Sequence, residues 1–241
     1  MRIFKLLSIL LAASLSSLSV SAFAAEDEKL DARLDAARNV IDQIMTVPDK
    51  KVPDDIARKA VCIGVVPGMV KGAFIFGAEY GQGVVTCRTG HGWSAPVFIR
   101  MAGGSWGFQI GGQGTDLILV ALNHKGFQDL LHDKFKIGAD AAAAAGPVGR
   151  DAQASTDLSM RAELLTWSRS RGAFAGVDLS GVSVSQNLAD TDALYGGNHP
   201  FEAILHGCVP PPPAAESFLH AVRRYFGAAQ MEKHAEHTAS E

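Results

Sequence analysis

Apolar and polar positions change their period along the chain, from the period of a helix to that of a strand. In residues 25–45 the apolar positions recur at spacings of four and three, which places them on one face of a helix. These positions are Leu30, Leu34, Ala37, Ile41 and Ile44. Charged residues cover much of the remaining surface, and Val47 and Pro48 follow the segment. The sequence therefore predicts an amphipathic helix that ends before Pro48.

Short segments between glycines then alternate with the period of two that is typical of β-strands. The predicted strands are 60–66, 72–80, 84–88, 93–100, 106–110, 163–168, 172–179 and 182–185. Pro67 and Gly68 predict a turn, and the glycine groups 81–83 and 111–114 indicate turns or close approach of two backbones. Pro96 lies inside its predicted strand, which indicates an edge strand or a bulge.

Other segments predict helices or leave the choice open. Helices are expected at 53–59, at 127–135 after Gly126, and at 216–228. Residues 117–122 form a continuous apolar run, which fits a buried strand or part of a helix. Alanines favour helix at 139–145, although the bounding glycines leave little length for one. The resulting fold class is α+β, a single domain whose antiparallel, barrel-like or sandwich β core is flanked by N- and C-terminal helices.

The first 24 residues have the composition of an export signal. Arg2 and Lys5 precede an apolar stretch that is too short to span a bilayer, and Ala22-Phe23-Ala24 matches a small-x-small cleavage site. Cleavage is expected after Ala24, and the expected location is the periplasm or the cell envelope. We expect three segments, which are a signal peptide at 1–24, a domain at 25–228 and a polar, disordered tail at 229–241.

Charge and cysteine content narrow the possible partners. The formal net charge is −3 at pH 7, which gives no reason to expect nucleic-acid binding. The chain has three cysteines, Cys62, Cys87 and Cys208, and no Cys-x-x-Cys motif. Cys62 and Cys87 fall in neighbouring predicted strands and could form a disulfide in an exported protein. Three buried, unbonded cysteines are the alternative.

One motif has the form of a catalytic site. Gly103, Ser105 and Gly107 fit the Gly-x-Ser-x-Gly pattern of serine hydrolases, in which a sharp strand-to-helix turn exposes the serine. Asp140 with a later histidine would supply the acid and the base, and the candidates are His199, His206 and His220. The residues after Gly107 alternate and carry glycines, so no helix is predicted there. We therefore expect no enzyme activity, and hydrolase chemistry at Ser105 is kept as an alternative.

Metal and cofactor sites are not indicated. Oxygen ligands gather late in the chain, at Asp178, Asn187, Asp190 and Asp192. Their spacing is not that of an EF-hand. His199, His206 and Cys208 lack a fourth ligand at a zinc-site spacing. We expect these acids to be solvated in turns, with no metal and no cofactor.

Basic residues near the junction of the first helices and the strands form a different kind of candidate site. They are Lys50, Lys51, Arg58, Lys59 and Lys71. If they converge on one face, they attract anionic headgroups, and each contributes about 1 kcal/mol. The first helix beside them has the pattern of a helix that lies in a membrane interface. Three acids are interleaved, Asp49, Asp54 and Asp55, so an ordinary solvated face is the alternative.

Short motifs occur in a specific order between residues 37 and 219. They are VPGMVKGAF at 66–74, GQGVV at 81–85, WSAP at 93–96, SWGFQIG at 105–111, GAD at 138–140, AGPVG at 145–149, SRSRGAFAG at 168–176 and YG at 195–196. Each motif is short, but the ordered set resembles the SYLF domain family, whose members include lipid-binding and actin-regulating modules in eukaryotes and exported bacterial proteins.

The family resemblance implies a function that the spacing of the residues alone does not indicate. The family is not an enzyme class, and lipid binding is its implied role. The resemblance also implies a strand at 139–145. Lys71 lies inside a matched motif and is therefore the best single candidate for lipid contact. The export signal argues against actin, because an exported protein does not meet it.

Two hypotheses for function result. The first is non-catalytic binding of anionic phospholipid at a bacterial envelope membrane, by basic headgroup contacts and apolar docking of the first helix. The second is a structural envelope protein that binds proteins or itself through a sheet edge near Pro96, with its oligomeric state left open.

Overall fold

The computed structural model describes residues 28–48, 51–73, 76–106, 111–123, 134–137, 143–146, 164–170, 179 and 181–227. The expected signal peptide and the expected disordered tail lie outside these residues. So do Lys50, most of the helix predicted at 127–135, and most of the strand predicted at 172–179. The N-terminal helix covers 28–45, as its apolar periodicity predicts.

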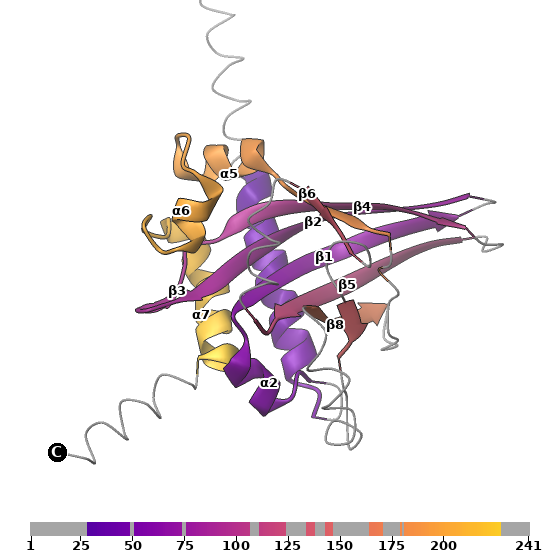
Figure 1. The fold of residues 1–241 in the computed structure, drawn as a ribbon, viewed down its shortest axis with the longest axis horizontal. Helices are drawn as coiled ribbons and strands as arrows, with labels where there is room; N and C mark the ends of the chain where they lie inside the picture. The colour runs from indigo at the N-terminus through magenta and orange to yellow at the C-terminus, as the bar shows by residue number, and fades with distance from the viewer. Residues whose placement is uncertain are drawn as a thin grey trace, which may run out of the picture.

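The strands of the described residues form one sheet in the order β6-β9-β4-β2-β1-β5-β8-β7, with the two-residue β3 paired to β2. The strands are β1 Cys62–Ala73, β2 Phe76–Thr89, β3 Gly92–Trp93, β4 Val97–Trp106, β5 Gly111–Ala121, β6 Lys134–Lys136, β7 Ala143–Ala145, β8 Leu164–Ser170 and β9 Ser183–Gln186. All pairs are antiparallel except β7 with β8. The sheet curls into a half-barrel, which confirms the predicted α+β class (Figure 1).

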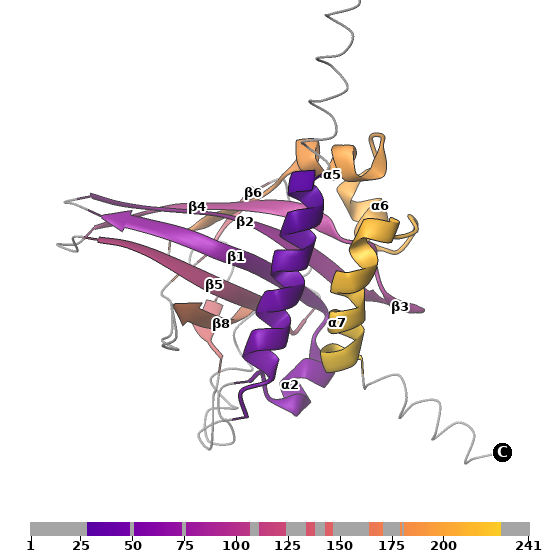
Figure 2. The ribbon, with the colours of Figure 1, turned by 180° about the vertical axis from the view of Figure 1, so that it is seen from behind.

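Helices cover one face of the sheet and one of its ends. The N-terminal helix and α7, Glu216–Phe226, lie side by side across the same face, with α2, Asp54–Lys59, below them (Figure 2). The short helices α5, Leu188–Tyr195, and α6, Phe201–Leu205, gather at one end, and the 3-10 turn η2, Pro213–Ala215, leads into α7. The long strands β1, β2, β4 and β5 extend beyond the helices on the other side (Figures 1 and 2).

Two apolar cores lie on the two faces of the sheet. On the helix side, the buried face of the N-terminal helix packs with α7 against alternate residues of the strands, among them Ile63, Val65 and Val84. On the other side, the intervening residues, such as Val66 and Val85, pack with α6 and the segment around β9. Alternate side chains of each strand therefore point into different cores, as the period of two predicted.

The expected turn at 67–68 and the two glycine groups at 81–83 and 111–114 all lie inside continuous strands. β1 runs through Pro67 and Gly68, where its register with β5 shifts between Val66 and Met69, so the pair forms a bulge. Gly68 has φ of 56°, a left-handed conformation that glycine adopts without strain. The groups 81–83 and 111–114 lie inside β2 and β5. A Cβ on Gly83 would lie 2.6 Å from the Val65 carbonyl oxygen, so close approach is the correct interpretation there.

The strand expected at an edge near Pro96 is an interior one. Pro96 precedes β4, which pairs with β2 on one side and β9 on the other. The Tyr195 hydroxyl donates a hydrogen bond of 2.6 Å to the Pro96 carbonyl, and burial raises the pKa of this tyrosine. Proline therefore marks the start of the strand and does not limit its pairing.

Two ambiguous segments are strands in the structure. The apolar run at 117–122 lies mostly in β5, between β1 and β8, so it is a central buried strand. Of the alanine segment, 143–145 forms β7, as the family resemblance implied. Phe135, expected on a helix, lies in β6 instead, where it is buried.

Cys62 and Cys87 form a disulfide between paired positions of β1 and β2. Both residues are fully buried, whereas Cys208 is free and exposed. The hypothesis of a Cys62–Cys87 disulfide is therefore confirmed, and the alternative of three buried, unbonded cysteines is wrong. The bond fixes the register of the two strands at one end of the pair.

Candidate functional site

The structure places the basic residues predicted from sequence in two separate regions. Lys51, Arg58 and Lys59 lie before or within α2. Lys71 lies in β1, opposite Glu79 of β2, about 30 Å along the strand from Cys62 at the ordinary rise per residue. Lys71 therefore does not belong to the group around α2.

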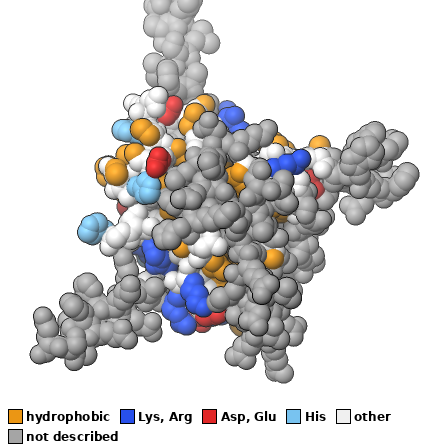
Figure 3. Space-filling model, viewed as in Figure 1, with side chains coloured by type: hydrophobic (Ala, Val, Ile, Leu, Met, Phe, Trp, Pro, Cys, Tyr) orange, Lys and Arg blue, Asp and Glu red, His pale blue; other side chains and the backbone are white. Residues whose placement is uncertain are grey.

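Lys51 and Arg58 face a cavity of about 350 Å³, which we call the basic pocket. Its lining residues are Met45, Lys51, Asp54, Arg58, Arg224 and Tyr225. They come from the end of the N-terminal helix, from α2 and the segment just before it, and from the last turn of α7. Figure 3 shows basic side chains gathered over α2 and α7, beside acidic ones.

The charge of the basic pocket is positive, because three cations and one carboxylate line it. The Lys51 ammonium lies 2.7 Å from the Asp54 carboxylate, but Asp54 is exposed and Lys51 is partly exposed, and such surface pairs contribute little. The Arg224 guanidinium lies 5.2 Å from the centre of the Tyr225 ring. Arg58 and Arg224 thus dominate the field that an anion meets here.

Arg88 joins the two helices that carry the basic pocket. Its Nε donates to the carbonyl of Ala60, just after α2, at 3.0 Å, and its Nη2 donates to the carbonyl of Phe226 in α7 at 2.7 Å. The guanidinium stacks over Trp93 at 4.7 Å from the ring centre. Burial lowers the pKa of Arg88. These contacts fix the ends of α2 and α7 so that Arg58 and Arg224 share one cavity.

A second hollow, of about 540 Å³, lies where the N-terminal helix crosses the sheet, and we call it the helix–sheet groove. The helix contributes Lys29, Ala32, Arg33 and Ala36. The strands contribute Pro67, Gly68 and Val70 of β1 and Tyr80, Gly81 and Gln82 of β2. The bulge at Gly68 is fixed because its backbone N–H donates to Asp116 at 2.9 Å, and Asp116 is paired with Arg169 at 2.7 Å.

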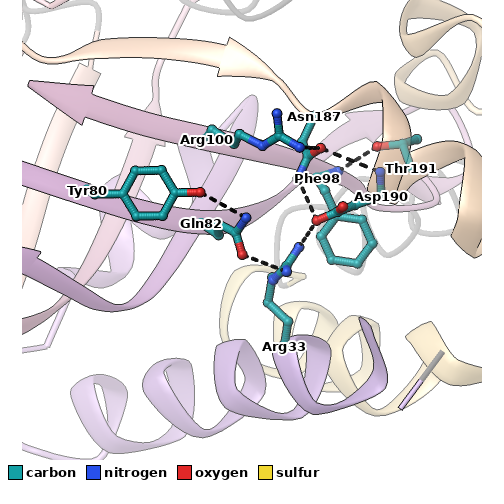
Figure 4. Close-up of polar contacts among 8 residues, drawn as sticks. All are labelled: Arg33, Tyr80, Gln82, Phe98, Arg100, Asn187, Asp190 and Thr191. Atoms are coloured by element: carbon teal, nitrogen blue, oxygen red, sulfur yellow. Dashed lines mark hydrogen bonds and ion pairs between the residues drawn. The ribbon is translucent and has the colours of Figure 1, made fainter. Parts of the chain in front are cut away.

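A polar network holds the side chain of Arg33, which lines the helix–sheet groove (Figure 4). Its Nη1 donates to Asp190 Oδ2 at 2.5 Å, and its Nη2 donates to Gln82 Oε1 at 2.7 Å. The guanidinium also lies 4.9 Å from the centre of the Phe98 ring. The Gln82 amide then donates to the Tyr80 hydroxyl at 3.0 Å. This chain of contacts connects the N-terminal helix, β2 and α5.

The acids that suggested a metal site have another role. Asp190 lies in α5, is buried and pairs with Arg33, so it is not a solvated turn residue as expected. Asn187 caps the same helix and donates to Asp190 at 2.5 Å. Asp178 lies outside the described residues. Among the residues that the structure describes, no group of three or more His, Cys, Asp or Glu side chains could hold a metal ion.

Ser105 lies inside a strand. It belongs to β4 and pairs with Gly77 of β2, so the chain does not make a strand-to-helix turn at this serine. Residues 107–110 lie outside the description, and β5 begins at Gly111. The backbone here therefore lacks the geometry that exposes a hydrolase nucleophile.

These features define a class of protein: a single α+β domain with a curled antiparallel sheet, a basic pocket and an open groove. No helix within the described ranges combines the length and apolar content needed to cross a membrane.

Comparison with known proteins gives the family. Residues 102–225 match the Ysc84 family, described as "Las17-binding protein actin regulator". The chain is 31% identical over 180 residues to LAS seventeen-binding protein 3 of Saccharomyces cerevisiae, covering 72% of this chain and 39% of that protein. It is 30% identical over 180 residues to SH3 domain-containing YSC84-like protein 1 of Rattus norvegicus, covering 74% of this chain and 53% of that protein. The chain therefore belongs to the Ysc84, or SYLF, family.

The chain spans about half the length, or less, of the curated relatives that it matches. The sequence motifs had identified the family, and this prediction is confirmed. Sequence reasoning missed Arg224 and Arg88, because their only signal was a pair of arginines at a predicted helix end and one arginine at a strand end. It also missed the helix–sheet groove, whose small residues carry no chemical signal.

Proposed function

We propose that this domain binds anionic phospholipid surfaces without catalysing a reaction, and that the basic pocket is the contact. One observation carries the proposal: Lys51 and Arg58 line a single open cavity together with Arg224, which is far from them in sequence. Basic residues near a membrane surface contribute about 1 kcal/mol each. Three of them give weak, reversible and salt-sensitive association.

The N-terminal helix does not supply the expected apolar docking. Its apolar face, including Leu34, Ile41 and Ile44, is completely buried against the sheet and α7. An insertion of this face into lipid would open the helix-side core. The proposal therefore rests on the cations of the basic pocket and not on the helix.

We further propose that the protein works outside the cytosol, at a bacterial envelope membrane. The predicted signal peptide motivates this location, and the Cys62–Cys87 disulfide supports it, since such bonds persist mainly in oxidising compartments. The family description names an actin regulator and a Las17-binding protein, and these words concern the relatives. An exported chain does not meet actin, so we do not propose an actin partner.

Self-association through a sheet edge receives less support. The edge expected near Pro96 does not exist, because β4 is paired on both sides. In the described part of the chain, the outer strands of the sheet are β6 and β7, with three residues each. Short edge strands, and lysines such as those of β6, are features that prevent edge-to-edge pairing.

Vesicle co-sedimentation tests the lipid proposal. We expect the wild-type protein to bind vesicles of phosphatidylethanolamine with phosphatidylglycerol and not vesicles of phosphatidylcholine. The double variant Arg58→Glu/Arg224→Glu should bind the anionic vesicles at least about tenfold more weakly, since two attractive charges become repulsive. Added salt should release the wild-type protein.

The control has the same change in charge away from the pocket. Arg38→Glu/Arg223→Glu alters two exposed arginines that pair with Asp42 and Glu216 and do not line the basic pocket. We expect most of the binding to remain in this variant. Equal loss in both double variants, or equal binding to neutral and anionic vesicles, would contradict the assignment to the basic pocket.

A further inference from the structure

We propose that the helix–sheet groove binds one anionic single-chain lipid, with the acyl chain along its apolar side and the headgroup at Lys29 and Arg33. The site is separate from the basic pocket, and the inference rests on the proposed function only for the class of ligand. The volume of about 540 Å³ falls in the range of small-molecule sites, about 300 to 1,000 Å³.

Small residues keep the helix–sheet groove open. Ala32 and Ala36 lie one turn apart on the same side of the N-terminal helix, where larger apolar residues would fill the space above the strands. Below them, the position where Gly68 would carry a Cβ has no heavy atom within 4 Å. The bulge that places Gly68 there is held by Asp116. The hollow is therefore built by the chain and is bounded on two sides.

An apolar surface runs along the strand side of the groove. Val70 and Tyr80 are 56% and 50% exposed, and with Leu188 they are the large apolar side chains that remain exposed among the described residues. They occupy directly opposed positions of β1 and β2, so their side chains are neighbours. A lipid chain that covers this pair removes apolar surface from water, which favours binding.

The polar groups at the groove suit an anion. Lys29 and Arg33 are cations on the helix; Arg33 is fixed in place by Asp190 and Gln82, and the Asp190 carboxylate already balances its charge. The Tyr80 hydroxyl accepts a hydrogen bond from Gln82, so its own proton is directed to another acceptor. A phosphate or carboxylate near Tyr80 would take this proton in a charge-assisted hydrogen bond. The Tyr80 hydroxyl and the helix cations thus favour an anionic headgroup, and the exposed Val70 and Tyr80 side chains favour an attached acyl chain.

The size of the groove favours a lipid over a protein partner. Stable protein contacts cover about 800 Å² on each partner, with a buried aromatic or arginine centre. Here the apolar part that the described residues expose is mainly one valine and one tyrosine beside a hollow of about 540 Å³. A single acyl chain with a small headgroup matches both the limited apolar area and the cations beside it.

Binding of monomeric lysophosphatidic acid with a lauroyl chain, below its critical micelle concentration, tests the inference by calorimetry. We expect saturable binding to the full chain, at least tenfold tighter than that of lauroyl lysophosphatidylcholine or of glycerol 3-phosphate. Ala36→Leu should fill the groove and weaken the binding at least tenfold. Gln43→Leu, an exposed substitution on the same helix outside the groove, should leave it unchanged.

Crossed variants separate this inference from the proposed function. Ala36→Leu should still co-sediment with anionic vesicles, and Arg58→Glu/Arg224→Glu should still bind lysophosphatidic acid. If Ala36→Leu does not fold, Tyr80→Ala at the exposed rim should show the same loss. Unchanged affinity in a folded groove variant, or loss of lysophosphatidic acid binding in the basic-pocket variant, would overturn the assignment. Equal affinity for lysophosphatidylcholine would overturn the headgroup contact.

Discussion

Gly81 and Gly83 show how the absence of a side chain determines local packing in β2. A Cβ on Gly81 would lie 2.6 Å from Val66 Cγ1, and one on Gly83 would lie 2.6 Å from the Val65 carbonyl oxygen. Both distances are far inside van der Waals contact. The strand that precedes these glycines, β1, therefore presses directly on the backbone of β2, and this contact follows the bulge in β1.

Gly83→Ala should destabilise the domain by about 2 kcal/mol, because the backbone oxygen of Val65 cannot move aside as a flexible side chain could. Urea unfolding should show a lower midpoint with an unchanged slope. Gly90→Ala is the matched control, since nothing lies within 4 Å of its Cβ position, and we expect a change within about 0.5 kcal/mol. Equal midpoints for the two variants would show that β1 and β2 adapt to the extra methyl group.

The N-terminal helix is a structural element of the domain. Seven of its apolar residues are at most 7% exposed, and they are Leu30, Leu34, Ala37, Val40, Ile41, Ile44 and Met45. Arg33 on the same helix pairs with Asp190 of α5, and Asp35 accepts a hydrogen bond from Ser217 of α7. The helix therefore connects the sheet, α5 and α7.

Ile41→Ala should reduce the free energy of unfolding by about 3 kcal/mol, the ordinary cost of a cavity at a fully buried isoleucine. Gln43→Ala, on the exposed side of the same helix, should change it by less than about 0.5 kcal/mol. Chemical unfolding measured by circular dichroism compares the two. A small effect of Ile41→Ala would mean that this helix leaves the sheet readily, which would revive apolar docking of the helix on membranes.

Regular periodicity made some elements predictable and its absence hid others. The N-terminal helix and α7 were predicted because their apolar residues repeat every three or four positions. The helix α5 was missed because the apolar residues of Leu188–Tyr195 do not gather on one face. The turn assigned at 67–68 was wrong, and of the two interpretations of 81–83 the turn was wrong and the close approach of two backbones correct. Glycine and proline serve a bulge and a close contact there, which local sequence does not distinguish from a turn.

The candidate site was only partly predictable for a different reason. Lys51 and Arg58 lie close in sequence, so their proximity could be expected. Arg224 joins them only because α7 returns beside α2, a long-range contact without a local signal. Lys71 was grouped with them because it follows α2 closely in sequence, but an extended strand carries it away. The distance between Lys71 and the basic pocket thus depends on the extended geometry of β1 and not on the number of intervening residues.

The disulfide makes the stability of the whole molecule depend on the redox conditions around it. Cys62 begins β1, immediately after α2, and Cys87 lies near the end of β2 beside Arg88, which contacts α2 and α7. Both sulfurs are inaccessible to solvent in the folded state. A reductant thus reaches the disulfide only when the protein unfolds, because both sulfurs are buried where the strands meet α2 and α7.

Cys62→Ala/Cys87→Ala should lose about 3 kcal/mol of stability, the usual value for a bond that spans 25 residues. In the native wild-type protein, a thiol reagent should label Cys208 alone of the three cysteines, since it is free and exposed. Reductant should expose Cys62 and Cys87 to the reagent only together with denaturant. Labelling of three thiols in the folded protein from an oxidising compartment would mean that the bond does not form.

The pairing of the first helix with the last has a consequence for biosynthesis. Asp35 and Ser217 are 182 residues apart, and α7 supplies part of the cover over the N-terminal helix. Contacts of such high order form late, because most of the polypeptide must emerge before they can close. A nascent chain thus presents an uncovered apolar helix throughout most of its translation. Chaperones therefore have access to this apolar surface during translation, and not in the folded protein.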